Sequence, residues 1–338
     1  MAMTPGTRML GLSAARYAVG ISSRGLSSGT TGGKGGWLAR SSPYARLMRL
    51  DKPIGSTLLF LPAAWAIVMA SPSLTEAVPT LALFASGSVL LRGAGCTIND
   101  YWDRDIDKQV KRTATRPIAA GEVSPRNALL FFSAQCLAGL PILLSMNATT
   151  IYLGVFSLVP VIALGVCFNF GALMGWTAVT NQLELPAVLL YLGCFCWTQV
   201  YDTIYAHADK ADDISVNIGS SALVLKDGTK KALTGFSLMS YGLVGMAGIS
   251  TGLPPLFFVF LAPSQIDLLN RIQRTDLDNP ESCIASFQAS RNTGFLVLLA
   301  IIIAKQILQR EAKAEAEEKE AEEAEETMEQ DSNRIGSW

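Results

Sequence analysis

The chain has 338 residues, of which 50% are hydrophobic and only 16% are charged, and its formal net charge at pH 7 is −1. With a mean hydropathy of +0.32, it is too apolar for an ordinary soluble enzyme. Its six cysteines include no CxxC pair and lie mostly in apolar runs, so neither a disulfide framework nor a zinc site is indicated. We predict an all-α protein that spans a membrane several times, with the lipid bilayer as a partner and no nucleic acid.

Residues 1–50 form a basic head with seven arginines and lysines, many serines and glycines, and no aspartate or glutamate. This composition is typical of a transit peptide, and the absence of a long apolar stretch argues against a secretory signal. We predict that residues 1–45 are a disordered transit peptide for import into an organelle. Arginine and serine enrichment alone does not separate the mitochondrion from the plastid.

Eight apolar runs joined by short polar loops indicate a membrane domain over residues 46–310. The runs cover residues 54–70, 81–95, 128–145, 150–179, 186–201, 232–250, 254–269 and 293–309. About 30 residues of helix at 150–179 would extend about 45 Å, which is too long for one untilted crossing of a core about 30 Å thick and too short for two. We predict that this run breaks near Pro160 or Gly165 into two short or partly re-entrant helices.

The first of two acidic segments, RGAGCTINDYWDRDIDKQVKRTATRP at residues 92–117, closes the second apolar run. On a helix, Asp100, Asp103 and Asp107 fall within about 60° of one another, whereas Asp105 points the other way. Three carboxylates on one face repel one another unless a cation lies between them, and Mg²⁺ bridging to a phosphate suits such hard oxygen ligands. Taken alone, the segment is better explained as a solvated acidic helix end than as a metal site.

The second acidic segment, YDTIYAHADKADD at residues 201–213, closes a later run. Asp202, Asp209 and Asp213 lie within about 40° on a helix, while His207, the only histidine, faces away and is interpreted as structural. Both acidic segments are followed by basic residues. Together they favour one site, in which metal ions lie between the carboxylates while arginine and lysine hold a diphosphate.

Beyond Arg310 the chain becomes a low-complexity acidic tail, EAKAEAEEKEAEEAEETMEQD, without an apolar stripe. We predict that residues 311–338 form a solvated, partly helical tail without chemistry of their own.

Five segments carry a family resemblance: LDKPIGSTLLFLPAAWA (50–66), RGAGCTINDYWDRDIDKQVKRTATRPIAAGEVS (92–124), CFNFGALMGW (167–176), YDTIYAHADKADD (201–213) and DNPESC (278–283). They closely resemble the UbiA family of intramembrane aromatic prenyltransferases, in particular its mitochondrial, ubiquinone-pathway branch. The resemblance covers residues from about 46 to 310. It implies nine transmembrane helices around a central cavity, of which we expect eight or nine here.

The resemblance also implies the reaction. A polyprenyl group would pass from polyprenyl diphosphate to the ring of 4-hydroxybenzoate, ortho to the hydroxyl, in the mitochondrial inner membrane. Mg²⁺ would assist ionisation of the diphosphate, and the resulting cation would substitute the aromatic ring. This branch belongs to ubiquinone and isoprene biosynthesis, so a ubiquinone-biosynthesis complex is an expected partner.

Candidate site residues come from both acidic segments and from the polar residues near them. The expected metal ligands are Asp100, Asp103, Asp107, Asp202, Asp209 and Asp213, and the carboxylates expected to be catalytic are Asp103, Asp107, Asp209 and Asp213. The residues expected to bind substrate are Asn99, Arg112, Arg116, Asn169, Tyr201, Tyr205, Lys226 and Lys230.

Each of the substrate candidates has a second interpretation. The arginines and lysines either contact the diphosphate or anchor the protein at the membrane surface, and Arg49 and Lys52 either meet the acceptor's carboxylate or act as anchors. Tyr201 and Tyr205 either shield a cation and bind the acceptor or belong to an interfacial aromatic belt. The amide of Asn169 needs a partner, which is either substrate or a neighbouring helix.

Two departures from the family pattern leave alternatives open. Ser290 stands where the family has asparagine, and the loop with Tyr-Pro, Lys-Arg and Trp-Pro-Gln between the fourth and fifth family helices is missing. The alternatives are a prenyltransferase for another acceptor such as homogentisate, a divalent-cation carrier, and an inactive or incorrectly joined variant. A carrier predicts carboxylates at mid-span, whereas these lie at span ends. A shared site further requires an even number of crossings between Asp107 and Asp202.

Overall fold

The computed structural model describes residues 42–109, 113–158, 168–210 and 219–335, with side chains as far as residue 323. Within these ranges every regular element is a helix, so the predicted all-α class is confirmed. The helices are α2 (Pro43–Leu47), α3 (Ile54–Ala70), α4 (Leu74–Trp102), α5 (Arg104–Asp107), α6 (Pro125–Leu144), α7 (Ala148–Leu158), α9 (Phe170–Thr180), α10 (Leu185–Ala208), α12 (Ser221–Leu225), the 3₁₀ helix η2 (Lys226–Gly228), α13 (Thr229–Ser250), α14 (Leu256–Arg274) and α15 (Pro280–Ile335).

Helix length and composition are those of a membrane protein. Helices α4, α6, α10, α13 and α15 are long and apolar enough to cross a bilayer, and α3, α7 and α9 are shorter apolar helices. Large apolar side chains are exposed on the outside of α4, α6, α10, α13 and α14, as expected where the solvent is lipid. The total of eight or nine crossings stays a prediction.

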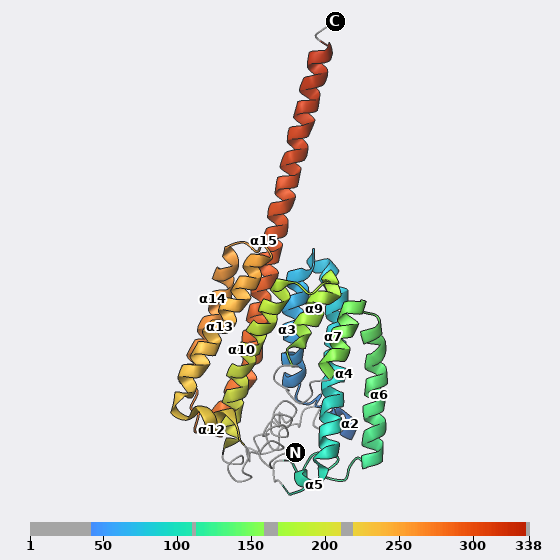
Figure 1. Ribbon diagram of the computed structural model, residues 1–338, viewed down its shortest axis with the longest axis vertical. Coiled ribbons are helices and arrows are strands. Elements are labelled where there is room, and N and C mark those ends of the chain that lie inside the picture. Colours follow the sequence, from blue (N-terminus) through green and yellow to red (C-terminus); the bar gives the residue numbers. More distant parts are fainter. Residues whose placement is uncertain (1–41, 110–112, 159–167, 211–218, 336–338) are drawn as a thin grey trace, which may run out of the picture.

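The helices pack side by side in a bundle (Figure 1). Helices α4 and α10, which carry the two acidic segments, both finish at the end of the bundle where α5 and α12 lie. We call this the acidic end. At the opposite end, the side-chain amide of Asn147 donates to the Thr177 carbonyl at 2.5 Å, and the Thr149 hydroxyl donates to the Asn181 carbonyl at 3.0 Å.

The long apolar run is divided into two helices, as predicted. Helix α7 ends at Leu158 and α9 begins at Phe170, and the hydrogen bonds at the opposite end join the start of α7 to the end of α9, so the two run antiparallel. Each has 11 residues and extends about 16 Å, roughly half of a bilayer core. Because the chain returns before α10 begins, both acidic segments reach the same end. The predicted break point, near Pro160 or Gly165, lies outside the described residues.

The core of the bundle is built around α10. The indole rings of Trp65 on α3 and Trp197 on α10 lie 5.1 Å apart between centroids, and Trp65 donates its N–H to the Gly294 carbonyl of α15 at 3.0 Å. A side chain at Gly294 would collide with Leu61 and Trp197, so glycine permits this close approach. The central cavity stays a prediction.

Helix α9 packs closely on α3 through two glycines one turn apart. A methyl group at Gly175 would lie 2.7 Å from the Ala63 carbonyl oxygen and 3.1 Å from the Ala63 Cα, which are backbone atoms. A methyl group at Gly171 would lie 3.4 Å from its nearest neighbours, the Ala63 Cβ and the Leu59 carbonyl oxygen. Small residues at this spacing let membrane helices approach closely and associate through packing.

We therefore expect Gly175→Ala to destabilise the protein by about 1–3 kcal/mol, because α9 must move away from α3. Thermal unfolding in detergent micelles measures the effect, with Gly171→Ala as a matched control on the same helix face. The Gly175→Ala variant should show the lower Tm of the two. Indistinguishable Tm values for both variants and the unmodified protein would contradict the packing described here.

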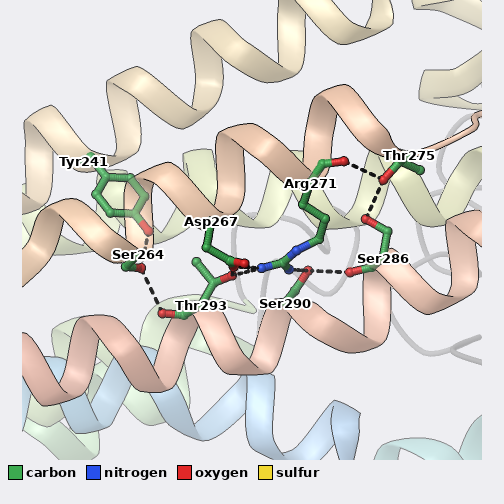
Figure 2. Close-up of polar contacts among 8 residues, drawn as sticks. All are labelled: Tyr241, Ser264, Asp267, Arg271, Thr275, Ser286, Ser290 and Thr293. Carbon is green, nitrogen blue, oxygen red and sulfur yellow. Dashed lines mark hydrogen bonds and ion pairs between the residues drawn. The ribbon is translucent and has the colours of Figure 1, made fainter.

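A polar seam joins α14 to α15 inside the bundle (Figure 2). The guanidinium of Arg271 contacts the Asp267 carboxylate one turn earlier and the Thr293 hydroxyl of α15, and Thr293 also donates to Asp267 at 3.2 Å. Ser264 donates to the Thr293 carbonyl at 3.1 Å, and Ser290 accepts from Arg271 at 3.4 Å. These contacts pair a charge that would otherwise be costly at this depth, and they tie the two helices together.

Helix α15 leaves the bundle at the end opposite α5 and α12 and continues as one helix to Ile335 (Figure 1). The residues at 311–323 are all exposed. The acidic tail is thus helical as far as the described residues reach. Its predicted start at residue 311 corresponds to a change in burial and not to the end of a helix.

Candidate active site

The first acidic segment forms the corner between α4 and α5. Asp103 ends α4 and begins α5, and its carbonyl accepts from the Asp107 N–H at 2.8 Å. Asp100 and Asp107 are buried, whereas Asp105 is exposed and pairs with Lys108 at 3.3 Å. The expectation that Asp105 points away from the other carboxylates is confirmed.

Two arginines contact the buried carboxylates of this corner. Arg49 Nη2 donates to both carboxylate oxygens of Asp100, at 2.8 and 2.9 Å. Arg116 Nη1 lies 3.2 Å from Asp100 Oδ1 and 2.9 Å from Asp107 Oδ2. We call these four residues the ionic network. Arg49, a candidate for the acceptor's carboxylate, is therefore paired with Asp100.

Like charges gather around the ionic network. Burial raises the pKa of the Asp107 carboxyl, Arg116 opposes this shift, and the neighbouring Asp100 and Asp103 add to it. Burial lowers the pKa of the Lys52 ammonium, Asp51 opposes this shift, and the nearby Arg49 and Arg116 lower the pKa further. A bound divalent cation would relieve the crowding of carboxylates, and a bound diphosphate would relieve the crowding of cations.

The second acidic segment occupies the last turns of α10. Asp202 lies within the helix, and Asp209 is its C-terminal cap. Asp213 lies outside the described residues, as does Arg112 of the first segment. His207 is buried, with Nε2 bonded at 3.2 Å to the hydroxyl of the first residue of α13, which agrees with the structural role predicted for it.

Within the described ranges, no three carboxylate, histidine or cysteine side chains converge closely enough to hold a metal ion alone. Mg²⁺ usually keeps several waters and binds through one or two carboxylates together with substrate phosphates. Asp103 and Asp107 on one helix end and Asp202 and Asp209 on another supply hard oxygens of this kind. The donor set therefore fits Mg²⁺ when a phosphate group completes the coordination.

Tyr201 and Tyr205 are buried within the bundle and do not lie in an interfacial belt. Both pack against Phe287 of α15, with ring centroids 5.9 and 5.1 Å away. The Asn169 amide donates to the Thr198 hydroxyl at 3.1 Å, and that hydroxyl is bonded to the Tyr201 hydroxyl at 2.9 Å. Of the two partners considered for Asn169, the structure supplies the neighbouring helix. Asn169 is thus linked to Tyr201 through Thr198, and the substrate contact expected from the sequence stays a prediction.

The remaining candidates differ in how close they come to the ionic network. Asn99 lies beside it, in the last turn of α4, and its carbonyl accepts from the Asp103 N–H at 2.8 Å. Lys230 donates to the Gln273 carbonyl at 2.7 Å, where α14 ends, so it caps a helix. Lys226 is exposed and adopts a positive φ of 47° between α12 and η2. Neither lysine contacts the ionic network in the part of the chain that the structure describes.

Sequence analysis missed Arg92. This arginine is 6% exposed within α4, lies near Tyr201, and fills the space over Gly55 of α3, where a Cβ would be 2.6 Å from its Nε. A cation inside an apolar run is itself the signal that could have found it, because charges within membrane segments are costly and usually functional.

Comparison with known sequences places this architecture among prenyltransferases. The model of the UbiA prenyltransferase family matches residues 59–164 and 156–299. The chain is 43% identical over 277 residues to "4-hydroxybenzoate polyprenyltransferase, mitochondrial" of Bos taurus, covering 77% of this chain and 75% of that protein. It is 41% identical over 282 residues to the protein of the same name from Schizosaccharomyces pombe, covering 77% and 79% of the two chains.

Solved structures share the fold. A UbiA homolog from Aeropyrum pernix K1 matches with a TM-score of 0.58 and 23% identity over 76% of this chain and 98% of its own. A UbiA homolog from Archaeoglobus fulgidus bound to GPP and Mg²⁺ matches with a TM-score of 0.55 and 18% identity over 77% and 99%. A helical membrane bundle with two acidic helix ends on one side defines an intramembrane enzyme of the prenyltransferase class. The chain belongs to the UbiA prenyltransferase family.

Proposed function

We propose that this protein transfers a polyprenyl group from polyprenyl diphosphate to 4-hydroxybenzoate. The allylic C–O bond breaks and diphosphate leaves with the bonding electrons. A C–C bond then forms at the ring carbon ortho to the hydroxyl, and that carbon loses its proton. The observation that supports this most strongly is the placement of both acidic segments at one end of an apolar bundle, with Arg116 paired to Asp107 of the first segment.

The carboxylates and cations of the acidic end would bind the diphosphate. Asp103, Asp107, Asp202 and Asp209 are the proposed Mg²⁺ ligands that the structure describes, and Asp213 completes the second segment. When bound, Mg²⁺ neutralises the charge that develops on the leaving group. Arg116, together with Arg112, would bind phosphate oxygens, because a guanidinium offers them paired donors.

The apolar interior would protect the reactive carbon. Tyr201 and Tyr205 present buried aromatic surface immediately beside Asp202, and Phe287 lies against both. Aromatic faces attract a delocalised cation, and a dry surrounding prevents water from capturing it. The acceptor carries a carboxylate, for which Arg92, near Tyr201 and buried among α3 and α4, is the proposed partner.

We further propose that the protein lies in the mitochondrial inner membrane as a multi-pass protein. Its relatives bear mitochondrial names, and its head is basic and free of acids. The loops opposite the acidic end, at 71–73, 145–147, 181–184 and 251–255, contain no lysine or arginine, whereas those at the acidic end contain many. This asymmetry favours an acidic end that faces the matrix. Because α2 already belongs to the fold, import residues would end before Pro43.

Assays of membranes that contain the protein test the proposed reaction. One labelled polyprenyl diphosphate is supplied with 4-hydroxybenzoate, with homogentisate, or with no acceptor. We expect product with 4-hydroxybenzoate and loss of product when EDTA removes Mg²⁺. If product forms with homogentisate and not with 4-hydroxybenzoate, homogentisate is the acceptor. If no product forms with either acceptor despite normal expression, the protein is an inactive prenyltransferase variant.

A further inference from the structure

Asp100 is enclosed by guanidinium groups. Both of its oxygens accept hydrogen bonds from Arg49, Oδ1 also lies 3.2 Å from Arg116, and the side chain is 2% exposed. A metal ion that bound this carboxylate would have to displace charge-assisted contacts from two arginines, each contact stronger than a neutral hydrogen bond. The surroundings of the Asp100 carboxylate therefore differ from those of the Asp103 carboxylate, which makes no ion pair in the part of the chain that the structure describes.

The segment before α3 is held in place to supply Arg49. Arg49 has a φ of 61°, a conformation that costs a residue other than glycine about 1 kcal/mol or more. Its Nη1 donates to the Arg46 carbonyl at 3.0 Å, Arg46 pairs with Glu122, and Leu47 is fully buried against Ile118 and its neighbours. Packing and hydrogen bonding of the preceding residues, Arg46 and Leu47, thus fix a strained residue whose side chain ends on Asp100.

Arg116 links Asp100 to the proposed metal site. Its Nη1 makes both ion pairs, with Asp100 and with Asp107, and no hydrogen bond or ion pair joins a described residue to its Nη2 or Nε. The second edge of the guanidinium is therefore turned away from both carboxylates. A planar guanidinium held by one nitrogen still presents two parallel donors, the arrangement that matches two phosphate oxygens.

We propose that Asp100 is a positioning residue: it orients Arg116 toward the diphosphate, with Arg49 as its counter-ion, and does not ligate Mg²⁺. This assignment revises the sequence prediction that Asp100 is a metal ligand, and it rests on the proposed function. The two roles predict opposite effects on a diphosphate in the absence of metal. Loss of a positioning residue weakens diphosphate binding, whereas loss of a carboxylate that only binds metal removes a negative charge and leaves binding equal or tighter.

Equilibrium binding of labelled inorganic pyrophosphate in EDTA separates these roles, with Asp100→Asn compared with Asp103→Asn. We expect the Kd of Asp100→Asn to rise about ten- to hundredfold, as for loss of one or two charge-assisted hydrogen bonds. Asp103→Asn should bind metal-free pyrophosphate at least as well as the unmodified protein but lose the gain in affinity that Mg²⁺ provides. In turnover, Asp100→Asn should raise KM for polyprenyl diphosphate more than it lowers kcat.

Arg49→Lys provides a second test that does not alter an acidic residue. It keeps the charge but loses the paired contact with Asp100, so Arg116 should be drawn toward Asp100 and metal-free pyrophosphate binding should weaken. Unchanged or tighter metal-free binding in Asp100→Asn would overturn the proposal, as would an unmodified protein that does not bind pyrophosphate without metal. Either binding result would leave product formation in the prenyl-transfer assay unchanged. Failure of the positioning role can therefore be distinguished from failure of the proposed reaction.

Discussion

Asp103→Asn and Asp209→Asn are each expected to lower the turnover of prenyl transfer by about a hundredfold or more. Each substitution removes a charge that holds Mg²⁺ against a developing diphosphate anion, and one such stabilising group in a water-poor site is worth about 3 kcal/mol. Neither carboxylate is fully buried, so the fold should persist. Initial rates in membranes, normalised to the amount of protein, measure the loss.

The matched control for this experiment is Asp105→Asn. Asp105 belongs to the same acidic segment, yet its side chain is 70% exposed, and among the described residues it pairs with Arg104 and Lys108, its neighbours in sequence. Exposed ion pairs of this kind contribute little to stability, so the control should keep normal turnover. Undiminished activity of both Asp103→Asn and Asp209→Asn would exclude a metal site shared between the two segments.

Helical periodicity predicted much of the site because local geometry decides it. Asp100 and Asp107 are buried and Asp105 is exposed, as a spacing of about 100° per residue predicted. The prediction assumed one continuous helix, whereas the structure has a break at Asp103 between α4 and α5. The divided run between α6 and α10 followed in the same way from helix rise and bilayer thickness. These predictions used only distances along the chain and the dimensions of the membrane.

Contacts between distant segments could not be predicted in this way. Lys230 follows the second acidic segment in sequence, but the end of α14 offers it an unpaired carbonyl, and it caps that helix. Asn169 finds Thr198 on a neighbouring helix. Arg49 reaches Asp100 only because a positive φ and the packing of α2 turn it there. In each case tertiary packing determines the hydrogen-bond or ion-pair partner, and composition and spacing do not reveal that packing.

The sidedness of the two acidic segments is an all-or-none prediction. They can share one metal and diphosphate site only if α4 and α10 emerge on the same face of the membrane, and the antiparallel pair α7 and α9 is what makes this possible. The outcome does not depend on acceptor identity or on prenyl chain length. It therefore tests the shared site itself.

Cysteine accessibility in sealed inner-membrane vesicles of known orientation is the most direct measurement. Two reporter variants, Asp105→Cys and Lys210→Cys, lie in the two acidic segments, and a third, Gln182→Cys, lies at the opposite end of the bundle. All three also carry Cys136→Ser, which removes an exposed native thiol that would otherwise react. With a membrane-impermeant maleimide, we expect Asp105→Cys and Lys210→Cys to be modified from the matrix side and Gln182→Cys from the other. Modification of Asp105→Cys and Lys210→Cys from opposite sides would contradict a shared site in this protein.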